Sequence, residues 1–137
     1  MNYQLLTVLT YIAMTLSHWI ADFIFQNDEE AIGKSTNFKL LIRHTSKYTL
    51  ISAFLWWLLI PSQFQFPNIT THIEGHINII YFMLITFTCH TITDFFTSKW
   101  TSKLWKENKR HLFFVVVGFD QLLHFTQLFL TYYFLIT

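Results

Sequence analysis

The chain has 137 residues and a net charge of +1, and its composition is 53% hydrophobic, 20% aromatic and 12% charged. Typical soluble domains are about one-quarter charged, and a soluble core of this size cannot bury sixteen Phe and five Trp residues. The composition therefore excludes an ordinary soluble fold and favours an integral membrane protein with the lipid bilayer as a partner, and the charge gives no reason to expect nucleic acid.

Four long apolar stretches predict four helices in a single domain that covers residues 1–137: residues 3–26, 38–60, 77–100 and 112–136. Each stretch would be about 34 to 37 Å long as an α-helix, enough to cross a hydrocarbon core of about 30 Å. The first stretch has no basic residue before it and no small-residue cleavage pattern after it, so we expect a spanning helix and no removable signal peptide. The predicted fold is all-α, an integral membrane four-helix bundle.

The Lys and Arg residues predict the orientation of these helices. All nine lie in or beside the first and third connections: Lys34, Lys39, Arg43, Lys47, Lys99, Lys103, Lys106, Lys109 and Arg110. Cytoplasmic connections are enriched in such residues, so both basic connections should face the cytoplasm, and both termini and the loop 61–76 should face outward. Two Trp pairs match interfacial aromatic belts at opposite ends of the helices: Trp56 and Trp57, and Trp100 and Trp105.

A short internal repeat relates the two halves of the chain. Residues 17–23 and 89–95 share His, Asp and Phe at identical spacing, as His18, Asp22 and Phe23 and as His90, Asp94 and Phe95. Each copy lies near the end of a predicted helix and is followed by another helix. The repeat therefore predicts two similar helical hairpins packed side by side.

Intramembrane His and Asp residues form the main candidate site. Residues four apart share one face of a helix, and three such pairs occur: His18 with Asp22, His90 with Asp94, and Asp120 with His124. His44 lies on the second predicted helix, close to Lys47. Measured from the cytoplasmic helix ends, these seven His and Asp residues lie about 6 to 18 Å deep, so all four helices bring polar groups to one half of the membrane.

Two interpretations of this constellation are open. Ionisable groups in hydrocarbon are costly and usually have partners inside the bundle. In the first interpretation, the His and Asp residues pair with one another, with Arg43 or Lys47 as counter-ions, and serve helix packing alone. In the second, they bind a divalent transition metal, because imidazole and carboxylate without thiolate suit Zn²⁺, Mn²⁺ or Fe²⁺, and four-helix bundles build dinuclear sites from such residues.

The metal-site interpretation gives each residue a role. The expected metal ligands are His18, Asp22, His90, Asp94 and Asp120. Asp120, His124 and His44 would complete the coordination or transfer protons, as catalytic residues. Arg43 and Lys47 would bind an anionic group of the substrate, such as a lipid phosphate.

Other polar residues have simpler interpretations. His72 and His76 could bind a metal as an i, i+4 pair, but a solvated pair in the outward loop is the favoured interpretation. Gln26 and Gln121 extend the polar helix faces and can form hydrogen bonds across helices. Cys89 has no second cysteine to pair with, and its simplest interpretation is a small buried residue.

The order and helix placement of these motifs resemble a known family. The motifs are His18-x-x-x-Asp22-Phe23-x-x-Gln26, Arg43-His44 with Tyr48-Thr49, His90-x-x-x-Asp94 and Asp120-Gln121-x-x-His124. They are similar to the bacterial and phage membrane proteins grouped as domain of unknown function 3307, and the resemblance covers most of the chain. It implies a small multi-spanning protein, expected in the bacterial inner membrane, without an established activity. Membrane-bound metal-dependent hydrolases are a looser analogy at the level of the fold. The acidic run at residues 27–30 departs from the expected pattern.

Two classes of function follow from this reading. The first is a membrane-embedded, metal-dependent hydrolase of a phosphorylated or lipid substrate, in which a metal-activated water attacks the substrate from the cytoplasmic side. The alternative is a non-enzymatic membrane module. It would be a proton or ion channel, for which a bundle this small would form a homo-oligomer, or a sensor or effector subunit.

Overall fold

The computed structural model describes residues 3–59 and 72–136, and every regular element in this part of the chain is a helix. The elements are α1 (Tyr3–Trp19), the π-helix η1 (Ile20–Ile24), α2 (Asp28–Gly33), α3 (Phe38–Leu59), α5 (His72–Lys106) and α6 (Arg110–Ile136). The predicted all-α class is confirmed. Helix α5 extends beyond the predicted range 77–100 at both ends, and α2 lies where an acidic loop was expected.

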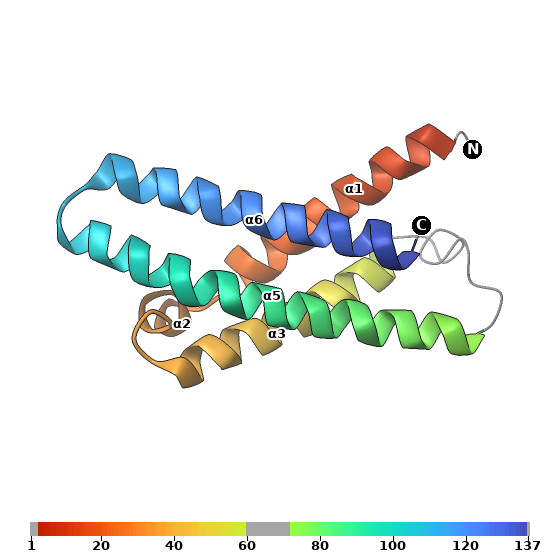
Figure 1. Ribbon diagram of the computed structural model, residues 1–137, viewed down its shortest axis with the longest axis horizontal. Coiled ribbons are helices and arrows are strands. Elements are labelled where there is room, and N and C mark those ends of the chain that lie inside the picture. Colours follow the sequence, from red (N-terminus) through yellow and green to blue (C-terminus); the bar gives the residue numbers. More distant parts are fainter. Residues whose placement is uncertain (1–2, 60–71, 137) are drawn as a thin grey trace.

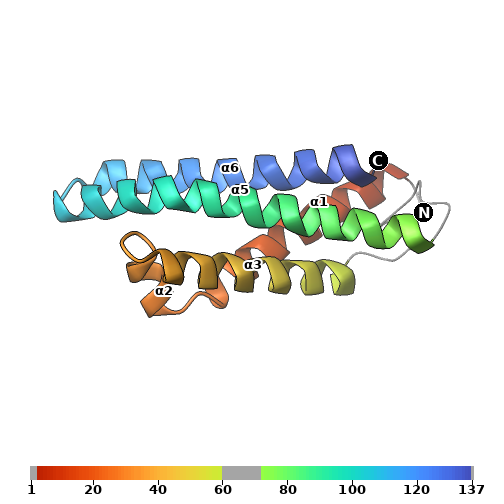
Figure 2. The same cartoon turned by 60° about the horizontal axis from the view of Figure 1, so that its bottom comes forward.

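The long helices pack around α5. Helices α5 and α6 run antiparallel and side by side, and α3 lies along α5 on the side away from α6 (Figures 1 and 2). Helix α1 crosses the bundle obliquely and contacts α3 and α6. Thus α5 and α6 form a tight hairpin, whereas α1 and α3 are joined through η1 and α2.

The turn between α5 and α6 depends on one left-handed residue. Asn108 has φ = 57°, a conformation that Asn adopts more readily than most side chains. The amide of the next residue, Lys109, donates to the carbonyl of Leu104 at 2.9 Å, which closes the end of α5. The Arg110 guanidinium lies 3.5 Å from the centre of the Trp105 ring. This turn places the basic end of the hairpin at the same end of the molecule as α2, opposite the start of α1 (Figure 1).

Helix α2 begins with a capping box. The Asn27 side chain accepts from the Glu30 amide at 2.9 Å, and the Glu30 side chain accepts from the Asn27 amide at 3.4 Å. Glu30 also binds two cations of α3, Lys47 at 2.5 Å and Arg43 at 3.0 Å. These bonds hold α2 against α3 and turn the segment that follows back toward the bundle.

The distribution of polar residues is inverted relative to a soluble protein. Large apolar side chains are exposed along the helices, including Phe96, Phe114 and Phe134, each at least 65% exposed. Many of the buried residues are His, Asp, Ser and Thr, and a smaller apolar cluster surrounds Met14 and Phe82. Such a continuous apolar surface needs an apolar solvent or partner.

Two described helical segments are long and apolar enough to cross a membrane by length and composition, Thr7–Ile24 and Arg110–Leu135. Helix α3 carries Lys39, Arg43 and Lys47 within its first half, which lowers its hydropathy. A bundle with four spanning helices therefore stays a prediction. So do the outward loop and the Trp belts, because the loop residues 61–71 and the side chains of Trp56, Trp57, His72 and His76 lie outside the described part.

Candidate metal centre

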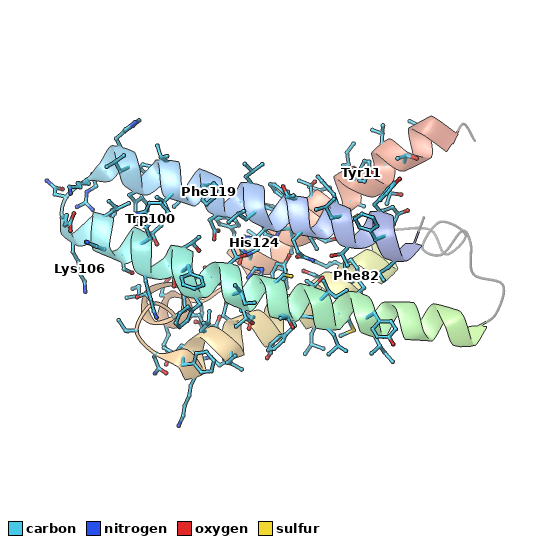
Figure 3. The ribbon with its side chains drawn as sticks, viewed as in Figure 1. Tyr11, Phe82, Trp100, Lys106, Phe119 and His124 are labelled. Atoms are coloured by element: carbon cyan, nitrogen blue, oxygen red, sulfur yellow. The ribbon has the colours of Figure 1, made fainter. Side chains whose placement is uncertain are left out.

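Five buried side chains from four elements meet in the middle of the bundle. Asp22 comes from η1, His44 from α3, His90 and Asp94 from α5, and His124 from α6, and each is at most 5% exposed. Figure 3 shows His124 near the midpoint of α6, facing the neighbouring helices. The convergence follows from the i, i+4 spacing, which directs both members of each pair to one helix face.

The π-helix positions Asp22. Its wider turn interrupts the first helix directly after Trp19, and Ala21 and Asp22 are its buried residues. Single π turns inside helices are rare and often occur at functional sites. Asp22 Oδ1 then lies 3.1 Å from His44 Nε2 on α3.

Two groups of three residues have ligand atoms close enough to hold a metal ion. In the first group, His44 Nε2 lies 3.1 Å from Asp22 Oδ1 and 3.3 Å from His90 Nε2, and His90 Nε2 lies 3.6 Å from Asp22 Oδ1. The second group contains His90, Asp94 and His124. In that group, Asp94 Oδ2 lies 3.6 Å from His90 Nε2, and Asp94 Oδ1 lies 3.8 Å from His124 Nε2. His90 belongs to both groups.

Three buried polar atoms at the centre lack a hydrogen-bond partner among the described residues: Asp22 Oδ1, His90 Nδ1 and His124 Nε2. The close contact of Asp22 with His44 is not aligned as a hydrogen bond. Buried polar atoms are normally paired, because leaving one unpaired costs about 1 to 3 kcal/mol. A bound cation would satisfy the free atoms of Asp22 and His124.

The tautomer of a neutral His124 ring is set by its own helix. Its Nδ1 lies 2.8 Å from the backbone carbonyl of Asp120, which only accepts, so Nδ1 carries the proton. The Nε2 lone pair therefore faces Asp94. Metal-binding His residues commonly have this arrangement, in which a carbonyl or carboxylate fixes the tautomer.

His18 lies beside the two groups and does not belong to them. Its Nε2 donates to Gln121 Oε1 at 2.9 Å, and its Nδ1 accepts from the Tyr48 hydroxyl at 2.8 Å. Both ring nitrogens are thus engaged. Tyr48 in turn stacks on His90, with ring centroids 3.8 Å apart, so His18 and Tyr48 together fix the plane of the His90 ring.

Asp120 also lies at the edge of the centre. Its carboxylate accepts from Thr97 at 2.6 Å and from Gln121 at 3.0 Å. The Gln26 side-chain amide lies 3.2 Å from His44 Nδ1. The predicted hydrogen bonding of Gln26 and Gln121 across helices is confirmed, and it orients side chains around the two groups.

Lys34 is a central residue that the sequence analysis did not single out. It lies between α2 and α3, and its Nζ is 2.7 Å from Asp94 Oδ2 and 3.4 Å from His44 Nε2. Burial opposes the charge, but attraction by Asp94 and Asp22 outweighs burial and raises the pKa of Lys34 above its usual value. A fixed positive charge therefore offsets the buried carboxylates.

Arg43 and Lys47 are directed away from the centre. Arg43 binds Glu29 at 2.5 Å, and both cations bind Glu30. Burial alone would raise the pKa of Glu30, but the hydrogen bond from Lys47 and further contacts lower it. The predicted substrate-binding cations therefore anchor α2, and neither lines the cavity that leads to the centre. The spacing Asn27-x-x-Glu30 was the sequence signal for α2.

A cavity of about 690 Å³ leads to the centre. Its inner end contains Asp22, Asp94 and Lys34, and Asp120 and Gln121 also line it. One wall consists of hydroxyl residues of α5, and the other of apolar side chains that include Phe113 and Val117 of α6. This volume is within the usual range of small-molecule sites.

No family model matches the chain, and neither the curated proteins nor the solved structures contain a significant match. The resemblance to domain of unknown function 3307 stays a prediction. A functional conclusion must come from the geometry of the centre and its cavity.

Proposed function

We propose that the chain is a membrane-embedded, metal-dependent hydrolase whose metal is held by residues of the two groups. One observation carries the proposal. The cavity is lined by Asp22 and Asp94, one candidate ligand from each group, so a substrate can reach the edge of the candidate metal position. A His and Asp cluster that served helix packing alone would not need this access.

The spacing of the first group supports a single ion. A tetrahedral metal with ligand bonds of about 2.0 to 2.2 Å holds its ligand atoms about 3.3 to 3.6 Å apart. The separations among Asp22 Oδ1, His44 Nε2 and His90 Nε2 are 3.1, 3.3 and 3.6 Å. Three protein ligands leave the fourth position for water or substrate, and the N and O donors suit Zn²⁺, Mn²⁺ or Fe²⁺.

The neighbouring residues are arranged for proton transfer. A divalent ion would supply Lewis acidity and activate water. Asp94 lies beside the first group, 3.1 Å from His44 Nε2, where it can take the proton of the attacking water, and His124 Nε2 is 3.8 Å from its other oxygen. The water oxygen forms the new bond to phosphorus or carbon, the ester bond breaks, and the proton passes to the leaving oxygen. Lys34 is the cation nearest to an anionic substrate group.

The basic connections and apolar surface support a location in the bacterial inner membrane with the cavity facing the cytoplasm. Helix α2 and the α5–α6 turn lie at the same end of the bundle (Figure 1). Lys34 directly follows α2, and Lys106, Lys109 and Arg110 belong to the turn or to the helix ends beside it. Positive charge favours the cytoplasmic side. Membership of domain of unknown function 3307 is part of this proposal, on the motifs around His18, Arg43, His90 and Asp120.

Proton conduction is a second candidate function, favoured by polar residues that continue beyond the centre. Gln127 lies one turn after His124 and donates to Thr86 at 3.3 Å and to Thr131 at 2.9 Å. Buried chains of this kind serve proton relays in membrane proteins. In this function the protein would act as a homo-oligomer or as part of a larger assembly.

Metal analysis of detergent-purified protein tests the hydrolase. We expect about one transition metal ion per chain by the single-ion geometry. The His90→Ala and Asp22→Asn variants should lose it, and His111→Ala, at an exposed position of α6, should retain it. Folded wild-type protein without affinity for Zn²⁺, Mn²⁺ or Fe²⁺ would rule out the hydrolase.

Liposomes separate the two functions. Hydrolysis of a short-chain phosphatidic acid that depends on added metal and is lost in His90→Ala supports the enzyme. Proton flux without hydrolysis supports the relay and rejects the enzyme. The His111→Ala variant is the control in both assays.

A further inference from the structure

The cavity continues toward the basic end of the α5–α6 hairpin. A second cavity of about 390 Å³ shares four lining residues with the first: Ser35, Thr36, Ser102 and Lys106. Lys99 and Lys103 line only this outer part. Figure 3 shows Lys106 near the tip of the hairpin, far along α5 from the metal groups.

The charges are separated along this path. The inner end has Asp22 and Asp94 with Lys34, whereas the outer part has three Lys residues and Glu107. Glu107 is bound by Lys109 at 2.7 Å and by Lys103 at 4.0 Å. Among the described residues, no ion pair is formed by Lys106. The outer part therefore favours an anion.

Ser98 provides an independent indication of a ligand. It lines the cavity, is 8% exposed, and its hydroxyl has no hydrogen-bond partner among the described residues. Its neighbours differ, because Thr97 donates to the Asp120 carboxylate at 2.6 Å and Thr101 donates to the carbonyl of Thr97 at 2.9 Å. A buried hydroxyl that is not satisfied by the protein is suited to donate to a bound group.

Ser98, Ser102 and Lys106 share one face of α5. They follow one another at four-residue spacing, which corresponds to about 6 Å along a helix. Side chains of a helix tilt toward its N-terminus, so Lys106 can reach back toward Ser102. Ser35 and Thr36 close the same space from the segment before α3.

We propose that the first cavity, where it adjoins this outer part, is a subsite for a phosphoryl group, held by the Ser98 and Ser102 hydroxyls and the Lys106 ammonium. Hydroxyls and an ammonium together provide the donors that phosphate oxygens need. The apolar wall formed by Phe113 and Val117 lies beside the subsite and can accept an alkyl chain. The assignment rests on the proposed hydrolase, because it names the class of its substrate as a phosphorylated amphiphile.

Calorimetry on the full chain in a neutral detergent tests the subsite. The probes are inorganic phosphate and dodecyl phosphate, each titrated into chelator-treated protein and into protein loaded with Zn²⁺. We expect saturable binding in both forms, because none of the three subsite residues belongs to the metal groups. Tighter binding of dodecyl phosphate identifies an amphiphile as the source of the phosphoryl group, and equal binding identifies soluble phosphate. Either result supports the subsite.

Matched variants locate the binding. Ser98→Ala and Lys106→Gln should each weaken binding about tenfold or more, as expected for a hydrogen bond to a charged group. Ser98→Thr keeps a hydroxyl and should bind like the wild type, and Lys39→Gln removes a charge from an exposed position of α3 that does not line either cavity. Equal affinity in Lys106→Gln and Lys39→Gln, with no effect of Ser98→Ala, would overturn the subsite. Phosphate binding without metal binding would reject only the hydrolase.

Discussion

Replacing Lys34 with Met removes the cation that offsets the buried carboxylates. The Nζ of Lys34 is 2.7 Å from Asp94, and the side chains are 13% and 2% exposed. Removing one partner of a buried ion pair costs about 3 to 5 kcal/mol because the other charge is left uncompensated. Since Lys34 is partly exposed and His44 still contacts Asp94, we expect about 3 kcal/mol for the metal-free protein.

A metal ion should compensate for this loss. A ligand at one hundred times its dissociation constant stabilises the folded state by about 2.7 kcal/mol, so metal should recover most of the stability of Lys34→Met. The free energy of unfolding can be followed by far-UV circular dichroism in mild detergent as a denaturing detergent is added. Lys39→Met, at an exposed position of α3, is the control and should change stability by less than about 0.5 kcal/mol. Equal effects of the two variants without metal would refute the role of Lys34.

Three further predictions use the same titration. Tyr48→Phe keeps the ring on His90 and loses the hydrogen bond to His18, so it should lower the free energy of unfolding by about 1 kcal/mol. Tyr48→Ala also loses the ring and should lower it by about 3 kcal/mol or more, and equal losses would contradict the stacking. The pKa of Glu30 is lowered, so its stabilisation should be present above its usual pKa of 4.5 and be lost as the pH falls below that value. Glu30→Gln should remove this part of the pH dependence, and an unchanged profile would contradict the ion pairs with α3. Asn108→Gly should leave the free energy of unfolding unchanged, whereas Asn108→Val should lower it by at least about 1 kcal/mol, because a β-branched residue is strained at φ = 57°. A Val variant as stable as the wild type would exclude the left-handed turn.

The convergence of the His and Asp residues could be predicted from sequence because it depends on helix periodicity. Any helix that buries His90 also turns Asp94 to the same side, and the same holds for Asp120 and His124. Buried polar groups seek one another inside an apolar bundle, so helices with such faces bring these faces together. The sequence pattern therefore indicated which residues lie near the site, but it did not indicate which of them contact one another.

The individual partners could not be predicted. His18 repeats the spacing of His90, yet hydrogen bonds to Tyr48 and Gln121 occupy both of its ring nitrogens. Arg43 and Lys47 lie close to His44 in sequence, yet Glu29 and Glu30 bind them from α2. The capping box of α2 was a readable signal, but the position of α2 against α3 depends on these long-range ion pairs.

The sequence by itself determined the all-α class, the apolar character of the surface and the helix faces that carry His and Asp, because these properties follow from composition and local periodicity. The tertiary structure decided which ligand atoms lie within about 3 to 4 Å of one another, a distance at which metal ligands meet. It widened one turn into a π-helix at Asp22 and folded Lys34 back over Asp94. Neither feature has a local sequence signal, because the contacts of Asp22 with His44 and of Lys34 with Asp94 join distant parts of the chain whose packing is set by the whole bundle.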